Sequence, residues 1–347
     1  MDVALRQRGR ALIDFEVEAR RAANRLQTII ERELATCGID ADSLPDAMDD
    51  RHAMIDGVLG QSGSFRARAL LGDICARTHG RVAEEAYDEI AADTGPMLAA
   101  DAQGATTLAA DADFTPPAYW ARTWFHRTYH GWEDHPHQGF IHGELIHKKY
   151  VAKIFPGDVY AARRAIARLA PRDHYATILE LGTSSGHYTE ALSDVFPAAS
   201  IIGIDPSLRM LEQAQRVGNA GGYGWDLRVA VGERTGLAED SVDLVTSYAI
   251  HHELPPRAID DIFAEALRVL KPGGDLLIAD VPRYADIDRL AAWRFDWLAK
   301  YGGEPFWRAS ASIDLAERAR QSGFTAVTSG TLPPRGDPYY VVATKPS

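Results

Sequence analysis

Apolar side chains in the first ninety or so residues recur at the spacing of α-helices. Between positions 3 and 34 they return every three or four residues, which places them on one face of a long amphipathic helix. This apolar stripe consists of Leu12, Phe15, Ala19, Ala22, Leu26, Ile29, Ile30 and Leu34. Further helices are expected over 46–59, 64–78 and 81–92. The chain therefore begins with a predicted helical layer whose apolar face must pack against something.

A change of composition ends this helical part. Gly, Ala, Thr, Asp and Pro dominate residues 94–117 without periodicity, and we interpret that segment as a loop. We assign residues 1–117 to a helical N-terminal domain and residues 118–157 to an aromatic and histidine-rich connector or lid. Beyond the connector, a short helix is expected over 159–169, with Asp158 as its N-cap.

From about residue 176 onward, short apolar runs alternate with helical segments. Seven runs are typical of strands: ATILEL, SIIGID, LRVAVG, VDLVTSY, DLLIADV, TAVTSGTL and YYVVATK. The helices expected between them cover 187–195, 207–217, 257–270 and 286–321. Helical connections imply parallel crossovers, whereas the short loop 333–338 predicts an antiparallel hairpin for the last two strands. We therefore predict an α/β protein in which residues 158–347 form a doubly wound, seven-stranded sheet with an antiparallel last strand.

Composition limits the class of protein further. The 347 residues are 46% hydrophobic, which excludes a disordered chain, and two cysteines are too few for a disulfide scaffold. The net charge of −12 repels polyanions, so we expect no nucleic-acid partner. No apolar run approaches the roughly 20 residues of a membrane span, and the N-terminus lacks the apolar core of a secretory signal. We expect a cytoplasmic protein with reduced thiols.

The connector is the most unusual part of the chain, because six histidines alternate there with large aromatic side chains. The pairs His126/His130 and His130/Glu133 have helical spacing. His135 and His137 flank a proline, so a metal site is one interpretation. No arrangement matches an established ligand pattern, and the same side chains suit a substrate pocket, a lid or packing between domains. We assign no metal ligands from the sequence.

The first strand of the predicted sheet runs into ILELGTSSGHYTEAL, where Glu180 and Gly182 end the strand and Gly186 opens the next helix. Glycines let the backbone approach a ligand closely, and a helix N-terminus offers free N–H groups. The second strand ends in SIIGIDPS, which places Asp205 at its tip. An acid there, roughly 20 residues after the glycines, can reach the ribose hydroxyls of a nucleotide. Together these features predict a nucleotide-binding site.

Two further strand ends complete an ordered set of motifs. VAVGERTG follows the third strand, the fourth ends in TSYAIHHEL, and RVLKPGG precedes the fifth. With these motifs, residues 140–347 resemble the class I S-adenosylmethionine-dependent methyltransferases, in particular the group that modifies small molecules. The resemblance implies a Rossmann-like fold, an enzyme, and S-adenosylmethionine as the methyl donor. In one departure, Ser184 replaces the central glycine of the family's ExGxGxG motif.

The resemblance also implies roles for individual residues. The glycine-rich turn would contact the methionine moiety, Asp205 the ribose, Glu233 or Arg234 the adenine surroundings, and Tyr248 with Ala249 the sulfonium side. The implied cofactor-binding residues are Glu180, Gly182, Thr183, Gly186, Asp205, Pro206, Met210, Glu233, Arg234, Tyr248 and Ala249.

Candidate catalytic residues follow the fourth strand, beside the expected methyl group. A hydroxyl or amine acceptor needs a base within hydrogen-bond reach, and an imidazole titrates near neutral pH. His251, His252 and Glu253 are the candidates, although one imidazole can instead hold the loop through backbone hydrogen bonds.

Aromatic residues are expected to wall the acceptor pocket. Besides the connector, the insertion after the fifth strand carries Trp293, Phe295, Trp297, Tyr301 and Phe306. Such walls favour a small hydrophobic or aromatic acceptor, with O-methylation preferred over N- or C-methylation.

The sequence is also compatible with other classes of protein. A nucleotide-binding protein without turnover could use its N-terminal helices as an interaction module, and those helices predict a possible homodimer. An NAD(P)-dependent oxidoreductase would carry GxGxxG in place of the GxxxG found after Glu180. The string DPYY at 337–340 resembles a motif of nucleic-acid methyltransferases, but in those enzymes the motif ends the fourth strand.

Overall fold

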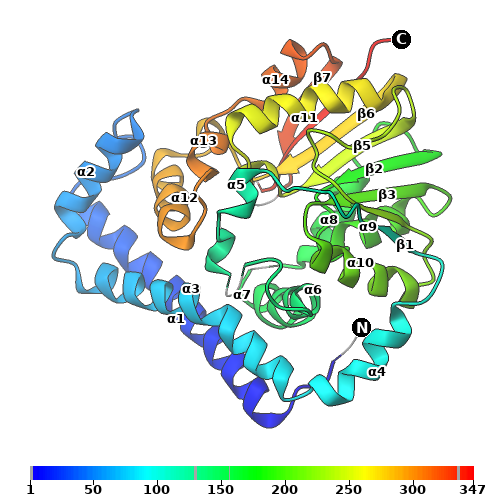
Figure 1. The fold of residues 1–347 in the computed structure, drawn as a ribbon. Coiled ribbons are helices and arrows are strands. Elements are labelled where there is room, and N and C mark those ends of the chain that lie inside the picture. The colour runs from blue at the N-terminus through cyan, green and yellow to red at the C-terminus, as the bar shows by residue number, and fades with distance from the viewer. Residues whose placement is uncertain (1–2, 129–130, 156, 334–336) are drawn as a thin grey trace.

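The structure is a computed structural model that describes residues 3–128, 131–155, 157–333 and 337–347. Its centre is an eight-stranded sheet in the order β1-β4-β3-β2-β5-β6-β8-β7 (Figure 1). β8 runs antiparallel to β6 and β7, and the other neighbours are parallel. The predicted α/β, Rossmann-like fold with an antiparallel last strand is confirmed, and the seven predicted strands are β2 to β8. The strands are β1 (Thr107–Ala109), β2 (Thr177–Leu181), β3 (Ser200–Asp205), β4 (Asp226–Val229), β5 (Val242–Tyr248), β6 (Leu270–Asp280), β7 (Thr325–Thr331) and β8 (Tyr339–Thr344).

Both faces of the sheet are covered by helices. Consecutive strand residues point to opposite sides, and both sides of these strands carry apolar side chains that must be buried. Ile178 packs into one apolar core with residues of α8, α9 and α10, while its neighbour Leu179 packs into a second core with α11 and α14. Asp158 caps α8, as predicted, by accepting hydrogen bonds from two backbone N–H groups. The helices are α8 (Val159–Ala167), α9 (His187–Val195), α10 (Leu208–Ala220), α11 (Pro256–Val269) and α14 (Leu315–Gln321).

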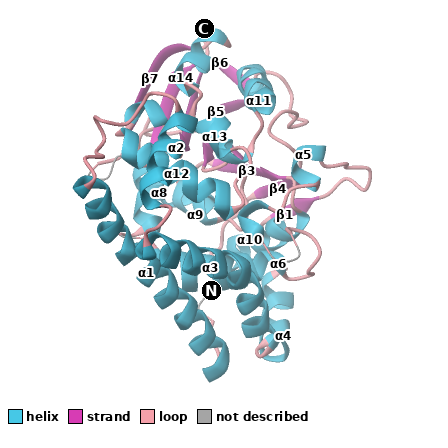
Figure 2. Ribbon diagram, turned by 90° about the vertical axis from the view of Figure 1, so that its left-hand side faces the viewer, coloured by secondary structure: helices cyan, strands magenta, loops and turns pink. Residues whose placement is uncertain are grey.

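Four helices precede the sheet, and the two longest lie side by side on the far side of the molecule from it (Figures 1 and 2). The predicted stripe on the first helix is only partly buried: Ile30 and Leu34 are covered, whereas Phe15 is 66% exposed. Ile13 and Val17, outside the predicted stripe, are buried instead. The buried face of α1 is therefore rotated about the helix axis relative to the predicted stripe, and the far edge of the stripe, with Phe15 and Ile29, faces outward. The four helices are α1 (Gln7–Thr36), α2 (Met48–Leu59), α3 (Gly63–Asp88) and α4 (Ala91–Asp101).

The interpretation of residues 94–117 as a loop was wrong. Helix α4 continues into this segment, and β1 pairs there with β4 as an edge strand. Thr106 anchors the strand, because its N–H donates to Asn219 and its hydroxyl to the carbonyl of Tyr223. A three-residue strand held by such tertiary contacts has no periodicity to detect. The helix expected over 64–78 and most of the one expected over 81–92 form one continuous helix, α3, because the single Gly80 between them does not interrupt it; α3 ends at Asp88, and residues 91–92 belong to α4.

Short helices of the connector lie between the N-terminal layer and the sheet (Figure 1). They are α5 (Ala118–Ala121), η1 (Phe125–Arg127), α6 (Gln138–Phe140), the π-helix η2 (Ile141–Val151) and α7 (Ala152–Ile154). The predicted histidine pairs that use His130 lie outside the described residues. After β6 come η4 (Tyr284–Asp286), α12 (Arg289–Gly302) and α13 (Trp307–Ala311), and Trp293 of α12 is buried against the N-terminal helices. Among the helices that the structure describes, none combines the length and apolarity needed to cross a membrane.

The possible homodimer stays a prediction. On α1 and α3, Phe15 and Leu70 are 66% and 61% exposed, and Ile74 is 39% exposed. Covering such side chains stabilises association by about 25 cal/mol per Å² of apolar surface removed from water. We expect light scattering on the full chain to give the mass of a dimer and Leu70→Glu to shift it toward the monomer. A monomeric wild-type chain would contradict this prediction.

Candidate active site

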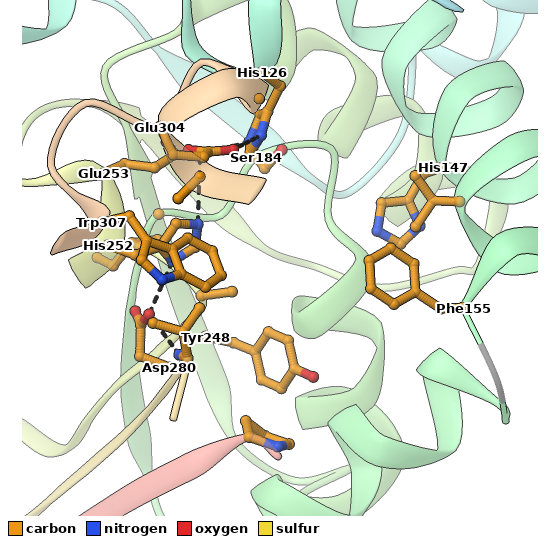
Figure 3. A pocket seen from close by; sticks show the side chains of 18 of the residues that line it. His126, His147, Phe155, Ser184, Tyr248, His252, Glu253, Asp280, Glu304 and Trp307 are labelled. Atoms are coloured by element: carbon orange, nitrogen blue, oxygen red, sulfur yellow. Dashed lines mark hydrogen bonds and ion pairs between the residues drawn. The ribbon is translucent and has the colours of Figure 1, made fainter. Parts of the chain in front are cut away.

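A cavity of about 1660 Å³ lies beyond the carboxyl ends of the central strands and extends beneath the connector to α3. Figure 3 shows His147 and Phe155 on one side of it, Glu253 and Trp307 on the other, and Tyr248 between them. Pockets for one small ligand commonly measure about 300–1,000 Å³. This cavity therefore has room for a nucleotide and a second molecule beside it.

The turn after β2 brings the backbone close to this cavity. Gly182 has φ +75°, and a Cβ on it would lie 2.3 Å from Cγ2 of Ile250. Gly186, with φ 88°, is the N-cap of α9. Ser184 has φ 49° and donates its N–H to Oδ2 of Asp205 at 2.9 Å. The residue that departs from the family's glycine pattern thus adopts the left-handed conformation that glycine favours.

Asp205, at the tip of β3, is held by backbone donors alone. Its Oδ2 accepts from the N–H of Ser184 and its Oδ1 from that of Ser207, at 2.9 Å and 2.8 Å. Burial raises the pKa of Asp205 to about 7, and the negative charges of Glu253 and Glu133 act in the same direction. In the described part of the chain no lysine or arginine pairs with this carboxylate, so its remaining lone pairs can accept hydrogen bonds from a ligand.

Most residues assigned to the cofactor line the cavity, and three do not. Glu180 is buried beneath the turn, where it accepts a hydrogen bond from Thr189 at 2.6 Å and where burial raises its pKa to about 8. Gly186 contributes the start of α9, and Arg234 is exposed in the turn after β4. The cavity wall includes Gly182, Thr183, Asp205, Pro206, Met210, Glu233, Tyr248 and Ala249.

The two candidate histidines differ in their surroundings. His251 is fully buried outside the cavity wall, and its backbone N–H donates to Oδ2 of Asp280 at 2.6 Å. His252 lines the cavity with its Nδ1 2.8 Å from Oδ1 of Asp280 (Figure 3). Burial lowers the pKa of His252, but the charge and hydrogen bond of Asp280, together with the charges of Glu253 and Glu304, outweigh burial and raise that pKa to about 9. Of the two imidazoles, His252 is the one that a ligand in the cavity can reach.

Glu253 lies in a cluster that joins three distant segments. Its Oε1 is 2.8 Å from Nε2 of His126, and the other ring nitrogen of His126 contacts Glu304 (Figure 3). His126 comes from the connector, Glu253 from the short helix η3 (His251–Glu253) after β5, and Glu304 from the turn between α12 and α13. The His252 and Glu253 side chains approach each other to 4.0 Å, so the cluster borders the histidine candidate.

Three residues at the site were not predicted from the sequence. Asp280 ends β6 just as Asp205 ends β3, so its place at a strand tip could have singled it out. Tyr119, which donates its hydroxyl to Glu233 at 2.6 Å, and Glu304 carry no such signal, because only the folded chain brings them to the sheet.

Comparison with known proteins finds methyltransferases among the relatives of this chain. Residues 178–274 match the family model of a methyltransferase domain. The trans-aconitate 2-methyltransferase of Azoarcus sp. is 35% identical over 127 residues, which are 36% of this chain and 46% of that protein. An uncharacterized methyltransferase of Synechocystis sp. is 30% identical over 165 residues, which are 43% of this chain and 67% of that protein. The solved structure of a phosphoethanolamine N-methyltransferase of Haemonchus contortus is similar with a TM-score of 0.45 and 18% identity, over 56% of this chain and 54% of that one.

The fold and the strand-end motifs define a nucleotide-binding methyltransferase domain. The chain belongs to the class I S-adenosylmethionine-dependent methyltransferases. The methyl donor of this family is S-adenosylmethionine, and the residues of the cavity fit such a ligand: the Gly182 turn brings backbone to the cavity wall, and Asp205 keeps lone pairs that can accept hydrogen bonds from hydroxyl groups. The chain spans about half the length of the curated relatives that it matches.

Proposed function

We propose that this protein transfers the methyl group of S-adenosylmethionine to an oxygen of a small, apolar molecule. The observation that carries the proposal is the position of Asp205 and the Gly182 turn on the wall of one large cavity, which also contains His252. A nucleotide bound at Asp205 and the Gly182 turn would leave the part of the cavity beside His252 for the acceptor. S-adenosylmethionine supplies the methyl group as a sulfonium, which needs no further activation.

The protein would contribute to catalysis by aligning the methyl donor with the acceptor and by excluding water. Asp205 would accept hydrogen bonds from both ribose hydroxyls, and Tyr248 with Ala249 would face the sulfonium. The acceptor oxygen attacks the methyl carbon in line with the departing thioether, while the proton of the hydroxyl passes to a base. The site residues proposed for the donor keep their assigned roles, except that Glu180 would act by holding the turn from beneath.

We assign the base to His252. Asp280 holds Nδ1 of this imidazole at 2.8 Å, which leaves Nε2 for the cavity. The same arrangement of carboxylate and imidazole fixes the tautomer in other general bases. Asp280 contributes to raising the pKa of this imidazole to about 9, and the positive charge of a bound sulfonium would act in the opposite direction and favour the neutral form. His251 would hold the turn through its backbone instead.

The acceptor class follows from the walls of the cavity. Aromatic side chains of the connector and the insertion line it, including Trp120, Trp132, Phe155, Phe295, Trp297 and Trp307. Relatives act on varied substrates, among them trans-aconitate and the malonyl group of an acyl-carrier protein, according to their names. The second of these names specifies O-methylation, which supports an oxygen as the acceptor atom.

An assay of methyl transfer tests the proposal. Purified protein is incubated with methyl-labelled S-adenosylmethionine and with phenols, aliphatic alcohols, carboxylic acids or amines in parallel. We expect labelled product with at least one apolar oxygen acceptor and none with amines alone. Labelling that is confined to protein or nucleic acid would contradict the proposal. Binding of S-adenosylhomocysteine without any turnover would favour a nucleotide-binding protein instead.

Replacing the first glycine of the turn is expected to reduce both stability and donor binding. In Gly182→Ala, the new Cβ would lie 2.3 Å from Cγ2 of Ile250. The alanine would also have to adopt φ +75°, which L-residues rarely adopt. Strain of this kind costs about 1–3 kcal/mol, and the displaced Ile250 would enter the cavity that it lines. Urea denaturation measures the first effect and calorimetric titration with S-adenosylhomocysteine the second. Gly57→Ala, with no atom within 4 Å of the new Cβ, is the control and should show neither loss.

Donor binding is expected to weaken below neutral pH. The pKa of Asp205 is raised to about 7 by burial, so its carboxyl becomes neutral as the pH falls through that value. Since the ionised form is the better acceptor for hydroxyls, affinity for S-adenosylhomocysteine should fall by up to tenfold per pH unit below about pH 7. Calorimetric titrations at about pH 8, 7 and 6 measure this dependence. Equal affinity at all three would show that the ligand does not depend on an ionised Asp205.

A further inference from the structure

We propose that His126, Glu253 and Glu304 bind one divalent transition-metal ion at the acceptor end of the cavity. One ligand atom from each side chain lies within 4.8 Å of those of the other two. Two ligands of a tetrahedral ion with bonds of about 2.1 Å are about 3.4 Å apart, so the three side chains would have to draw together by at most about 1.4 Å to complete the site. All three residues line the cavity.

The charges of the cluster are not balanced by a permanent cation. In the part of the chain that the structure describes, neither Glu253 nor Glu304 forms an ion pair with a lysine or arginine; the basic groups beside them are His126 and His252, and Asp280 adds a further negative charge near Glu253. Arg127, next to His126 in the chain, turns away and pairs with Asp73 at 2.8 Å. Two carboxylates that share one imidazole favour a cation between them.

An unpartnered oxygen points independently to a missing ligand. The side chain of Glu304 is only 10% exposed, and its Oε2 is buried without a hydrogen-bond partner. A buried carboxylate oxygen that accepts no hydrogen bond costs free energy unless a ligand satisfies it. Because Glu304 lines the cavity beside His126, an ion held there would satisfy this oxygen.

The backbone of the connector is shaped to present His126 to this point. His126 has φ 54° and Arg127 has φ 52°, and non-glycine residues adopt this region only where the surroundings require it. The N–H of His126 also donates to the carbonyl of Gly303 at 3.1 Å, directly before Glu304. The connector and the end of α12 are therefore fixed to each other at the cluster.

The donor set selects the class of ion. Carboxylates alone suit Mg²⁺ and Ca²⁺, whereas an imidazole with carboxylates suits Mn²⁺, Fe²⁺ or Zn²⁺. Three protein ligands leave open positions that face the cavity, as in catalytic rather than structural metal sites. The use of these positions to hold an oxygen of the acceptor rests on the proposed function, whereas binding of the ion itself does not.

Calorimetric titration of the full chain, without a histidine tag and after dialysis against a chelator, tests the site with MnCl₂ and ZnCl₂. We expect one ion per chain for at least one of them and at least about tenfold weaker binding in Glu304→Gln and in His126→Gln. His174→Gln, which removes an exposed histidine far from the cluster, is the control and should bind like the wild type. His126→Gln provides the comparison alone if Glu304→Gln does not fold.

Two results would overturn the inference: neither ion binds stoichiometrically, or both variants bind as the wild type does. The first would leave His126 as a protonated imidazole between two carboxylates. A parallel titration of metal-free protein with S-adenosylhomocysteine separates this inference from the proposed function. If the nucleotide binds and no metal does, the inference fails and the proposed function stands; if a metal binds and the nucleotide does not, the reverse holds.

Discussion

Asp205→Ala is expected to weaken the binding of S-adenosylhomocysteine by about a hundredfold or more. The carboxylate would accept two hydroxyl hydrogen bonds, and each hydrogen bond to a charged group contributes about 1.5–3 kcal/mol. Two such losses amount to roughly 3 kcal/mol or more, and each 1.4 kcal/mol is a factor of ten in affinity. The loss also removes the acceptor for the N–H groups of Ser184 and Ser207, so the glycine-rich turn becomes less ordered. Isothermal titration calorimetry measures the affinity.

A matched control distinguishes this effect from damage to the sheet. Asp226 begins β4, which pairs with β3, but it lies at the opposite end of the strands from Asp205. Asp226→Ala removes a carboxylate whose partner is Arg228 on the same strand, and it should leave nucleotide affinity within about twofold. Equal affinities of wild type and Asp205→Ala would remove Asp205 from the nucleotide site.

His252→Gln is expected to lower kcat by about 10²–10⁴-fold, which is the usual contribution of a general base. The glutamine keeps a polar group beside Asp280, but its amide cannot take up the proton that the methyl acceptor releases. Affinity for S-adenosylhomocysteine should change little, because the residues proposed to hold the donor, Asp205 and the Gly182 turn, stay in place. Steady-state kinetics with the acceptor found in the transfer assay, together with calorimetry, measure the two effects separately.

The pattern of effects identifies the role of His252. A residue that only holds the turn would lower the midpoint of unfolding or the nucleotide affinity while kcat stays near its original value. His174→Gln, at an exposed position, should change none of these quantities. Unchanged kcat in His252→Gln would assign proton transfer elsewhere, with Glu253 as the nearest remaining candidate.

The sheet could be predicted because its strands are local signals with sharp ends. Runs such as SIIGID and VDLVTSY carry apolar side chains at consecutive positions, since helices cover both faces of the sheet, and polar turns bound them. Helix bounds followed from the same alternation, and His187–Val195 forms over the predicted residues. The edge strand at Thr107–Ala109 could not be predicted, because contacts with Asn219 and Tyr223, far along the chain, create it.

The donor end of the site was accessible to sequence reasoning for a similar reason. Parallel strands bring their carboxyl ends to one edge, so Asp205, Glu233 and Tyr248 could be placed together without knowledge of side-chain positions. The acceptor end depends on where the connector and the insertion fold back over that edge. The contacts of His126 with Glu253 and Glu304 join residues far apart in the chain, and no spacing rule relates them.

The most direct test of this account is a crystal structure of the protein with S-adenosylhomocysteine bound. We predict that the ribose hydroxyls will lie within hydrogen-bond distance of the Asp205 carboxylate, with the sulfur facing Tyr248 and the cavity that contains His252. A nucleotide bound elsewhere, or one whose ribose makes no contact with Asp205, would contradict the account.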